Sequence, residues 1–319
     1  MTTYDIFNGD ADGICALIQL QLDTPRDSIL ITGVKRDIKL LAQVDPSEGD
    51  IINVLDIALE KNREALDSCL QAGALINYFD HHNPGSIPQH KNLTSHINTD
   101  ANTCTSLIVN EHLAGRFVAW AITGAFGDNM IQSALSIAAK TTLSDEDVHT
   151  LKLLGTYINY NGYGPNESVL HFPPADLFKL LRPFESPLDF VEHNKTVFDK
   201  LQNGYNSDLE AANSLEPYVS NDSSAIYMLP DLPWAKRVSG VFGNQLASDH
   251  PNKAHAIITE IPGNNYLVSV RAPLTNKEGA DEICLQFNTG GGRKGAAGIN
   301  KLPAEQLDMF ISVFQKYYQ

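Results

Sequence analysis

Short apolar runs that end on an aspartate constrain the fold of this chain more than any other feature. Four runs in the first half have the length and composition of strands, at residues 4–7, 29–32, 51–55 and 74–79, and three of them lead into aspartates. Helix-like patterns separate the runs, at residues 13–22, 37–43 and 60–72. Strands that alternate with helices are typical of βαβ units. We therefore expect an α/β fold with a parallel sheet.

The pattern becomes helical after these runs and changes again near residue 190. Helices are predicted at residues 103–113, 116–125, 130–140 and 144–157, the last opened by an acidic capping box of Ser144 and Asp147. A second unit has strand-like runs at 225–229, 254–261 and 266–271, and helical patterns at 235–248, 279–287 and 303–317. We predict a domain at residues 1–190, a helical linker at 191–218 and a smaller α/β domain at 219–319.

Composition supports two cores and excludes several classes of protein. Hydrophobic residues make up 43% of the 319 residues, and no apolar run approaches the roughly 20 residues that cross a bilayer. The first ten residues contain no Lys or Arg, whereas a signal peptide begins with a positively charged region, so we do not expect a signal peptide here. Four separated cysteines without a CxxC pair argue against a disulfide framework or a thiolate zinc site. We expect a cytoplasmic protein with no membrane partner.

The charge balance limits which phosphates this chain can bind. Lys and Arg number 23 against 38 Asp and Glu, so the formal net charge is −15. Proteins that hold long nucleic acids carry broad basic surfaces. We therefore expect a local pocket with metal ions, and no binding of long duplex nucleic acid.

The aspartates that follow the strands are predicted to meet. Carboxyl ends of parallel strands share one edge of the sheet, which would gather Asp10, Asp12, Asp56 and Asp80 beside His81 and His82; Asp128 ends a fourth, helical run. Crowded carboxylates either take up protons or bind cations. Oxygen and imidazole ligands suit Mn²⁺ or Mg²⁺, and their number suggests two ions roughly 3.5–4 Å apart. The alternative for each residue alone is a turn or a helix cap.

The order of these motifs resembles the DHH phosphoesterase superfamily. The motifs are Asp10-Ala-Asp12-Gly13, Asp56, Asp80-His81-His82 and Gly127-Asp128, and the glycine-rich stretch at 290–298 resembles the associated DHHA1 domain. Members of this superfamily hydrolyse phosphodiester or phosphoanhydride bonds with two metal ions, usually Mn²⁺. They include nanoRNA-degrading oligoribonucleases (nanoRNases), phosphatases of 3′-phosphoadenosine 5′-phosphate, cyclic-dinucleotide phosphodiesterases and single-strand-specific exonucleases.

The resemblance implies a role for each motif residue. Asp10 and Asp56 would hold the first ion, and Asp12, Asp56, His81 and Asp128 would hold the second. Asp80 would orient a histidine. His82 would stabilise charge on the phosphate or protonate the leaving group, which makes His82 and Asp80 the catalytic pair. The implied cofactor is two Mn²⁺, with Mg²⁺ as the alternative.

The chain departs from the superfamily pattern at two positions. Many relatives have a metal-binding His where this chain has Asn8, so we treat Asn8 as a doubtful ligand and expect a weaker first ion. Where a His often follows the three glycines, this chain has Arg293, a good bidentate phosphate ligand. Substrate binding is therefore assigned to Gly290, Gly291, Gly292 and Arg293, through backbone N–H groups and the guanidinium.

Three weaker candidates lie elsewhere in the first domain. The segment 33–37, with Arg36, follows a strand and could contact phosphate or be an exposed helix start. Residues 102–106 are typical of a helix N-terminus, which could cap itself or receive an anion. The turn at 159–164 could stack a base on Tyr160 or Tyr163, or be purely structural.

These observations together predict a two-metal phosphoesterase. Its substrates would be short oligoribonucleotides, dinucleotides or nucleoside bisphosphates, and a homodimer is one possible assembly. The first alternative is a single-strand-specific exonuclease. The second is a nucleotide-binding sensor whose catalysis has lapsed because Asn8 weakens one metal.

Overall fold

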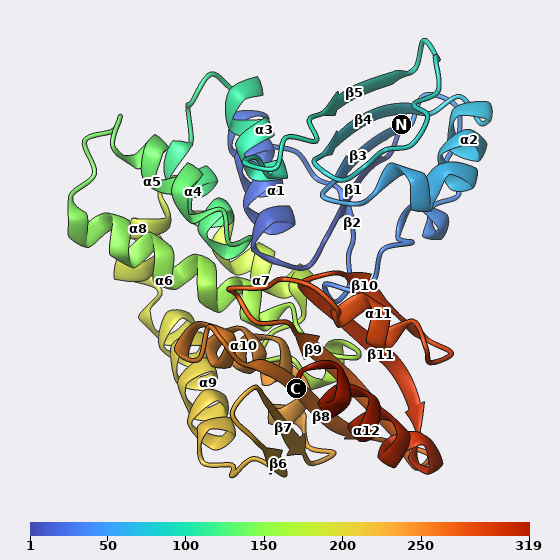
Figure 1. Ribbon diagram of the computed structural model, residues 1–319. Coiled ribbons are helices and arrows are strands. Elements are labelled where there is room, and N and C mark those ends of the chain that lie inside the picture. The colour runs from blue at the N-terminus through green and yellow to red at the C-terminus, as the bar shows by residue number, and fades with distance from the viewer. The chain divides into compact units, whose positions relative to one another are not determined.

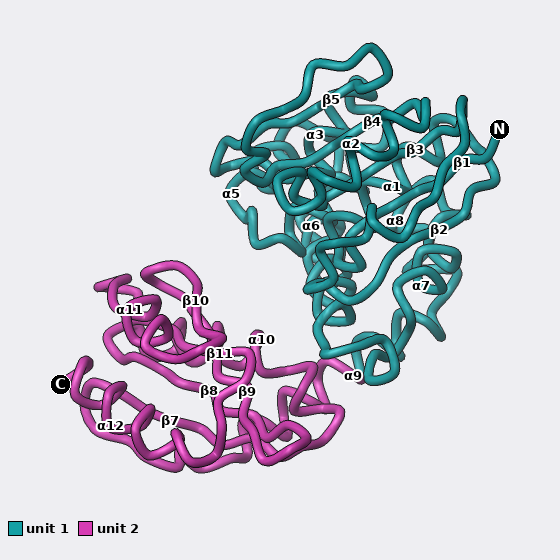
Figure 2. The backbone as a smooth tube through the Cα atoms, turned by 90° about the vertical axis from the view of Figure 1, so that its right-hand side faces the viewer, with its two compact units in different colours: residues 1–203 teal, residues 204–319 magenta.

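The computed structural model describes all 319 residues and divides them into two compact units. The first comprises Met1–Asn203 and the second Gly204–Gln319, shown in separate colours in Figure 2. The division falls inside α9 (Lys195–Asn213), within the stretch predicted as a helical linker.

The first unit is built on the parallel sheet that the sequence predicts. Five strands pair in the order β2-β1-β3-β4-β5, all parallel, and the unit's helices lie on either side of them (Figure 1). Their bounds are β1 Thr3–Phe7, β2 Ile29–Ile31, β3 Ile51–Leu55, β4 Leu75–Asp80 and β5 Leu93–Ile97. The edge strand β5 was not predicted, because its sequence (LTSHI) lacks a continuous apolar run.

Apolar side chains on one face of this sheet pack against the helix that follows β3. That helix is α2 (Arg63–Gln71), preceded by a 3₁₀ turn at Leu59–Asn62. Its buried residues meet those of the strands and form one core, with Ile6, Ile52, Val54, Leu66, Leu70 and Tyr78. The helix predicted at 37–43 is wrong for most of its length, since only Leu41–Gln43 forms a 3₁₀ turn.

The opposite face of the sheet carries α1 (Ala11–Asp23), and a layer of helices extends from it (Figure 1). These helices are α3 Thr105–His112, α4 Val118–Gly127, α5 Ile131–Ala138, α6 Asp145–Asn161, α7 Pro174–Leu181 and α8 Pro187–His193. The predicted capping box is confirmed: Ser144 accepts from the Asp147 backbone, and Asp147 accepts from the Ser144 backbone. None of the helices is both long and apolar enough to span a membrane.

The second unit is a mixed six-stranded sheet with helices, in the order β10-β11-β9-β8-β7-β6. The strands are β6 Val219–Ser220, β7 Ser224–Leu229, β8 Ala254–Ile261, β9 Asn265–Arg271, β10 Gly290–Arg293 and β11 Ala296–Pro303. The helices are α10 Pro233–Asp249, α11 Ala280–Cys284 and α12 Leu307–Tyr317. The glycine-rich stretch at 290–298 therefore lies in an antiparallel hairpin at the edge of the sheet.

Candidate functional site

The strand order places two of the motif aspartates on either side of one crevice. With the order 2-1-3-4-5, the connections from β1 and β3 leave in opposite directions, and ligands bind at such a switch point. Asp10 lies just beyond β1 and Asp56 directly after β3. Asp56 also has a left-handed backbone, with φ of 59°, which is costly for a residue other than glycine. Strain of this kind is typical of functional positions.

The start of α1 fixes Asp10. Its side chain caps the helix by accepting hydrogen bonds from the backbone N–H groups of Asp12 and Gly13, both at 3.1 Å. Gly13 is required here, because a Cβ atom would lie 2.3 Å from the Asn8 carbonyl oxygen. The DxDG motif therefore allows α1 to begin close against the end of β1.

Asp12, in the first turn of α1, joins two helices. Its carboxylate oxygens accept from the backbone N–H groups of Thr105 and Ser106, each at 2.7 Å. These N–H groups open α3, whose N-cap residue Cys104 offers no side-chain cap. The predicted helix start at 102–106 therefore does receive an anion, and that anion is a carboxylate of this chain.

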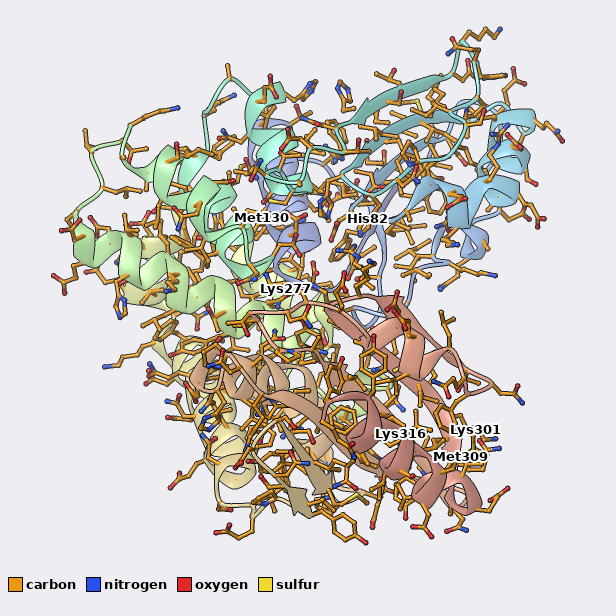
Figure 3. The ribbon with its side chains drawn as sticks, in the orientation of Figure 1. His82, Met130, Lys277, Lys301, Met309 and Lys316 are labelled. Carbon is orange, nitrogen blue, oxygen red and sulfur yellow. The ribbon has the colours of Figure 1, made fainter.

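The two adjacent histidines differ in their hydrogen bonds. The His81 Nδ1 atom lies 3.1 Å from the Thr103 carbonyl oxygen, so this nitrogen donates and Nε2 keeps its lone pair. His82, labelled in Figure 3, lies two residues after the end of β4 and donates from Nδ1 to Asp80 Oδ1 at 2.7 Å. His81 is thus set up as a metal ligand, whereas Asp80 orients His82.

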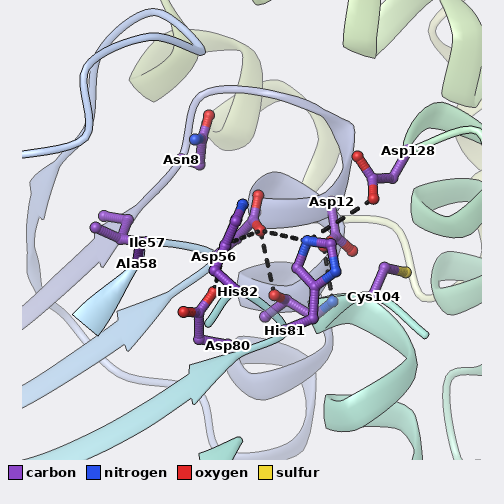
Figure 4. A network of polar contacts seen from close by, with 12 residues as sticks. Asn8, Asp12, Asp56, Ile57, Ala58, Asp80, His81, His82, Cys104 and Asp128 are labelled. Atoms are coloured by element: carbon purple, nitrogen blue, oxygen red, sulfur yellow. Dashed lines mark hydrogen bonds and ion pairs between the residues drawn. The ribbon is translucent and has the colours of Figure 1, made fainter. Parts of the chain in front are cut away.

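The remaining ligand atoms converge on the His81 Nε2 atom. Asp56 Oδ1 lies 3.5 Å away, and Asp128 Oδ2, from the end of α4, lies 3.8 Å away (Figure 4). Two sets of three groups could each hold an ion, namely Asp12 with His81 and Asp128, and Asp56 with His81 and His82. The structure thus brings together the residues predicted for the second ion.

Burial and mutual repulsion shift the protonation of this cluster. Burial, with the charges of Asp10 and Asp12, raises the pKa of Asp56 well above its ordinary value. Burial and the Asp12 carboxylate raise the pKa of Asp128 to about 6. The hydrogen bond to Asp80 raises the pKa of His82, which favours its imidazolium form. Without a cation the cluster is electrostatically unfavourable, and a divalent ion would relieve it.

Lys35 is a member of this site that the sequence analysis did not assign. Its ammonium lies 2.6 Å from Asp10 Oδ2 and 3.6 Å from Asp128 Oδ1. Burial lowers the pKa of Lys35, but this effect is outweighed by the nearby Asp10, Tyr163 and Asp128. The pKa of Lys35 is therefore well above its ordinary value. The neighbouring Arg36, which was singled out instead, is exposed. The one available signal was the position of the 33–37 segment after a strand.

The residue chosen as a doubtful ligand has another contact. Asn8 donates from Nδ2 to the Lys35 carbonyl oxygen at 3.2 Å, and its Oδ1 atom is buried without a partner. Figure 4 shows Asn8 apart from the labelled carboxylates, with no interaction drawn to them.

The donor set fits one divalent ion well. Asp12 and Asp128 in one set of ligand atoms, and Asp56 in the other, supply carboxylate oxygens. His81, which both sets share, supplies an oriented nitrogen, and this combination of donors suits Mn²⁺. The set predicted for the first ion is different. Asp10 already accepts two backbone N–H groups on one oxygen and the Lys35 ammonium on the other.

The glycine-rich hairpin of the second unit presents one unpaired cation of its own. Gly291 and Gly292 lie in the edge strand β10, opposite Gly298 and Ala297 of β11. Lys294 pairs with Glu278 at 3.2 Å, whereas Arg293 is exposed and no ion pair engages it.

Comparison with known proteins shows the fold. Neither a family profile nor a curated protein sequence matches the chain. Among solved structures, the manganese-bound exonuclease RecJ aligns with a TM-score of 0.64 and 14% identity, over 99% of this chain and 90% of its own. The chain has the RecJ fold.

Two further structures share this RecJ-like arrangement. RecJ from Thermus thermophilus in complex with Mn²⁺ gives a TM-score of 0.62 at 15% identity, over 99% of this chain and 52% of its own. The pGpG-specific phosphodiesterase PggH from Vibrio cholerae gives 0.59 at 15% identity, over 99% of both chains. These similarities confirm the predicted α/β fold.

Proposed function

We propose that this protein is a metal-dependent phosphoesterase that hydrolyses phosphodiester or phosphomonoester bonds of short nucleotides. The observation that carries the proposal is the convergence of Asp12, Asp56, His81 and Asp128 at the switch point of the sheet. Two neighbours in fold, RecJ and PggH, are an exonuclease and a phosphodiesterase, which supports the same chemistry.

A bound Mn²⁺ or Mg²⁺ would supply Lewis-acid polarisation of the phosphate and a lowered pKa for water. The chain's own contribution begins with the ligands. The Thr103 carbonyl fixes the tautomer of His81, so that Nε2 points to Asp56 and Asp128. Both oxygens of Asp12 are held by the start of α3. Such fixed groups need no reorganisation when substrate arrives.

His82 is the proton donor in this proposal. Asp80 is fully buried and holds the Nδ1–H of His82, which leaves Nε2 free on a side chain that is 41% exposed. The hydrogen bond to Asp80 raises the pKa of His82, which favours the form that carries a proton on Nε2. From there it can be donated to the leaving oxygen, or hydrogen-bonded to the phosphate as negative charge develops.

Short substrates are favoured by charge and by length. A net charge of −15 repels a long polyanion, which would need a broad basic surface. PggH, whose structure is covered to 99% by this chain, is specific for the dinucleotide pGpG. We therefore place linear dinucleotides first among the candidate substrates. Arg293, on the exposed hairpin, is proposed to bind a substrate phosphate with Gly290, Gly291 and Gly292.

Hydrolysis of a panel of compounds in the presence of Mn²⁺ tests the proposal. A concentration of about 1 mM saturates a metal site of micromolar affinity. The panel holds pGpG, pApA, oligoribonucleotides of increasing length, 3′-phosphoadenosine 5′-phosphate and a long single-stranded DNA. We expect turnover of the short compounds and little of the DNA. Preferred digestion of the DNA would favour the exonuclease alternative, and tight nucleotide binding without turnover would favour the sensor. No turnover by metal-loaded protein contradicts the proposal.

A further inference from the structure

The superfamily resemblance assigns Asp10 to a first ion, and in this structure Asp10 binds the ammonium of Lys35. We propose that the Lys35 ammonium takes the place of the first metal ion, so that this chain binds a single divalent ion beside a permanent organic cation. The inference deepens the proposed function, because it specifies how many ions the same site uses. It rests on where Lys35 and Asn8 lie.

The Lys35 side chain is held from several sides. Its Nζ atom donates to Asp10 Oδ2 at 2.6 Å and to Asn159 Oδ1 at 3.1 Å, and lies 3.6 Å from Asp128 Oδ1. It also lies 5.6 Å from the centre of the Tyr163 ring, within range of a cation–π interaction. Only 29% of the side chain is exposed. A surface lysine that pairs by chance would not have four partners.

The main chain of Lys35 is anchored as well. Its N–H donates to the Gly162 carbonyl at 2.9 Å, and its carbonyl accepts from Asn8 Nδ2 at 3.2 Å. The superfamily resemblance implies a metal-binding His at position 8. In this chain, Asn8 instead donates a hydrogen bond to the backbone of Lys35, and the ammonium of Lys35 contacts Asp10. The two departures, Asn8 and Lys35, thus act together.

The partners of the Asp10 carboxylate also indicate that the ammonium replaces a metal ion. Oδ1 accepts two backbone N–H groups at the start of α1, and Oδ2 receives the ammonium. A divalent ion bound to Asp10 would meet a like charge a few ångströms away. Among Asp12, Asp56, His81 and Asp128, only Asp128 is approached by the ammonium, at 3.6 Å, and the imidazole of His81 is oriented for a metal ion.

Metal stoichiometry tests this inference without any assay of activity. The full chain would be saturated with Mn²⁺ and examined by native mass spectrometry and by electron paramagnetic resonance. We expect one Mn²⁺ per chain and no exchange-coupled pair. Lys35→Met removes the ammonium, and Asn8→His/Lys35→Met also introduces an imidazole at position 8. Both variants should bind two ions and give a coupled spectrum.

Two matched variants keep the experiment interpretable. Lys35→Arg retains a cation and should remain at one ion. Lys39→Met, which removes an exposed lysine four residues along the chain, should also remain at one ion. Two ions on the unmodified chain overturn the inference whatever the variants do. A single ion on folded Asn8→His/Lys35→Met protein also overturns it. A chain that binds one ion yet hydrolyses no nucleotide would leave the inference standing and contradict only the proposed function.

Discussion

Two groups of buried carboxylates occur on the same parallel sheet, and they differ in how they are partnered. Asp5, in the middle of β1, is fully buried and accepts four hydrogen bonds. The donors are Gln21 at 2.7 Å, Ser28 at 2.6 Å, Arg26 at 3.0 Å and Asn53 at 2.7 Å. Every oxygen therefore has partners, and the charge is paired.

Two of the carboxylates at the ends of the strands, Asp56 and Asp80, have fewer donors. Asp80 is fully buried, yet its Oδ2 atom has no hydrogen-bond partner. Asp56 has a single side-chain hydroxyl, Thr105 Oγ1 at 3.2 Å, and is surrounded by other aspartates. A partnered carboxylate stabilises the fold, whereas crowded ones cost stability until a cation arrives. Crowded, poorly partnered carboxylates of this kind are typical of functional sites.

The largest effect is expected at Asp56. Asp56→Asn removes the carboxylate that lies closest to the His81 Nε2 atom, and should lower kcat/KM by about 10³-fold or more, because an ion could no longer be held in place. The same change relieves repulsion, so the metal-free protein should unfold at an equal or higher urea concentration. Steady-state kinetics and urea unfolding measure the two effects. A large loss of stability would abolish the contrast with Asp5.

The reverse outcome is expected at Asp5. Asp5→Ala leaves buried donors of Gln21 and Asn53 unpaired and should lower the free energy of unfolding by about 3 kcal/mol. Because Asp5 touches no ligand of the proposed ion, kcat per folded molecule should stay near that of the unmodified protein. Urea unfolding and active-site titration check this. A selective fall in kcat would place Asp5 in the catalytic machinery.

A buried histidine of the second unit offers a pH test away from the acidic cluster. Burial, with His250 and Lys253, lowers the pKa of His255 from 6.5 to about 4. Between these values the unfolded chain binds the extra proton, so the free energy of unfolding falls as the pH falls through this window, by about 2–3 kcal/mol. His255→Leu should remove that loss. An unchanged pH dependence of unfolding in the variant would show that other groups cause it.

The smallest effect is expected at the exposed hairpin. Arg293→Ala should raise KM for a dinucleotide about tenfold with kcat nearly unchanged, since a phosphate contact outside the reacting centre contributes to binding alone. Lys294→Ala is the matched control, because Lys294 is already paired with Glu278. Equal effects of the two substitutions would indicate general electrostatics in place of a specific contact.

Much of the sheet and of the clustering of acidic residues could be predicted because both depend on local pattern. Four strands showed as apolar runs, and the motif aspartates were placed by the rule that parallel strands end at one edge. Contacts between distant segments gave no such signal. The sequence does not show that Lys35 reaches Asp10 or that Asn8 holds Lys35, since these contacts span 25 and 27 residues. The partners of Asp5 were missed for the same reason.

We infer that one divalent ion lies among Asp12, Asp56, His81 and Asp128. Anomalous diffraction at the manganese edge, from crystals of the full chain soaked in Mn²⁺, tests it most directly. We expect a single strong anomalous peak in contact with these four side chains, and we expect the Lys35 ammonium to remain paired with Asp10. A peak bound by Asp10, or no peak among the four ligands, would contradict it.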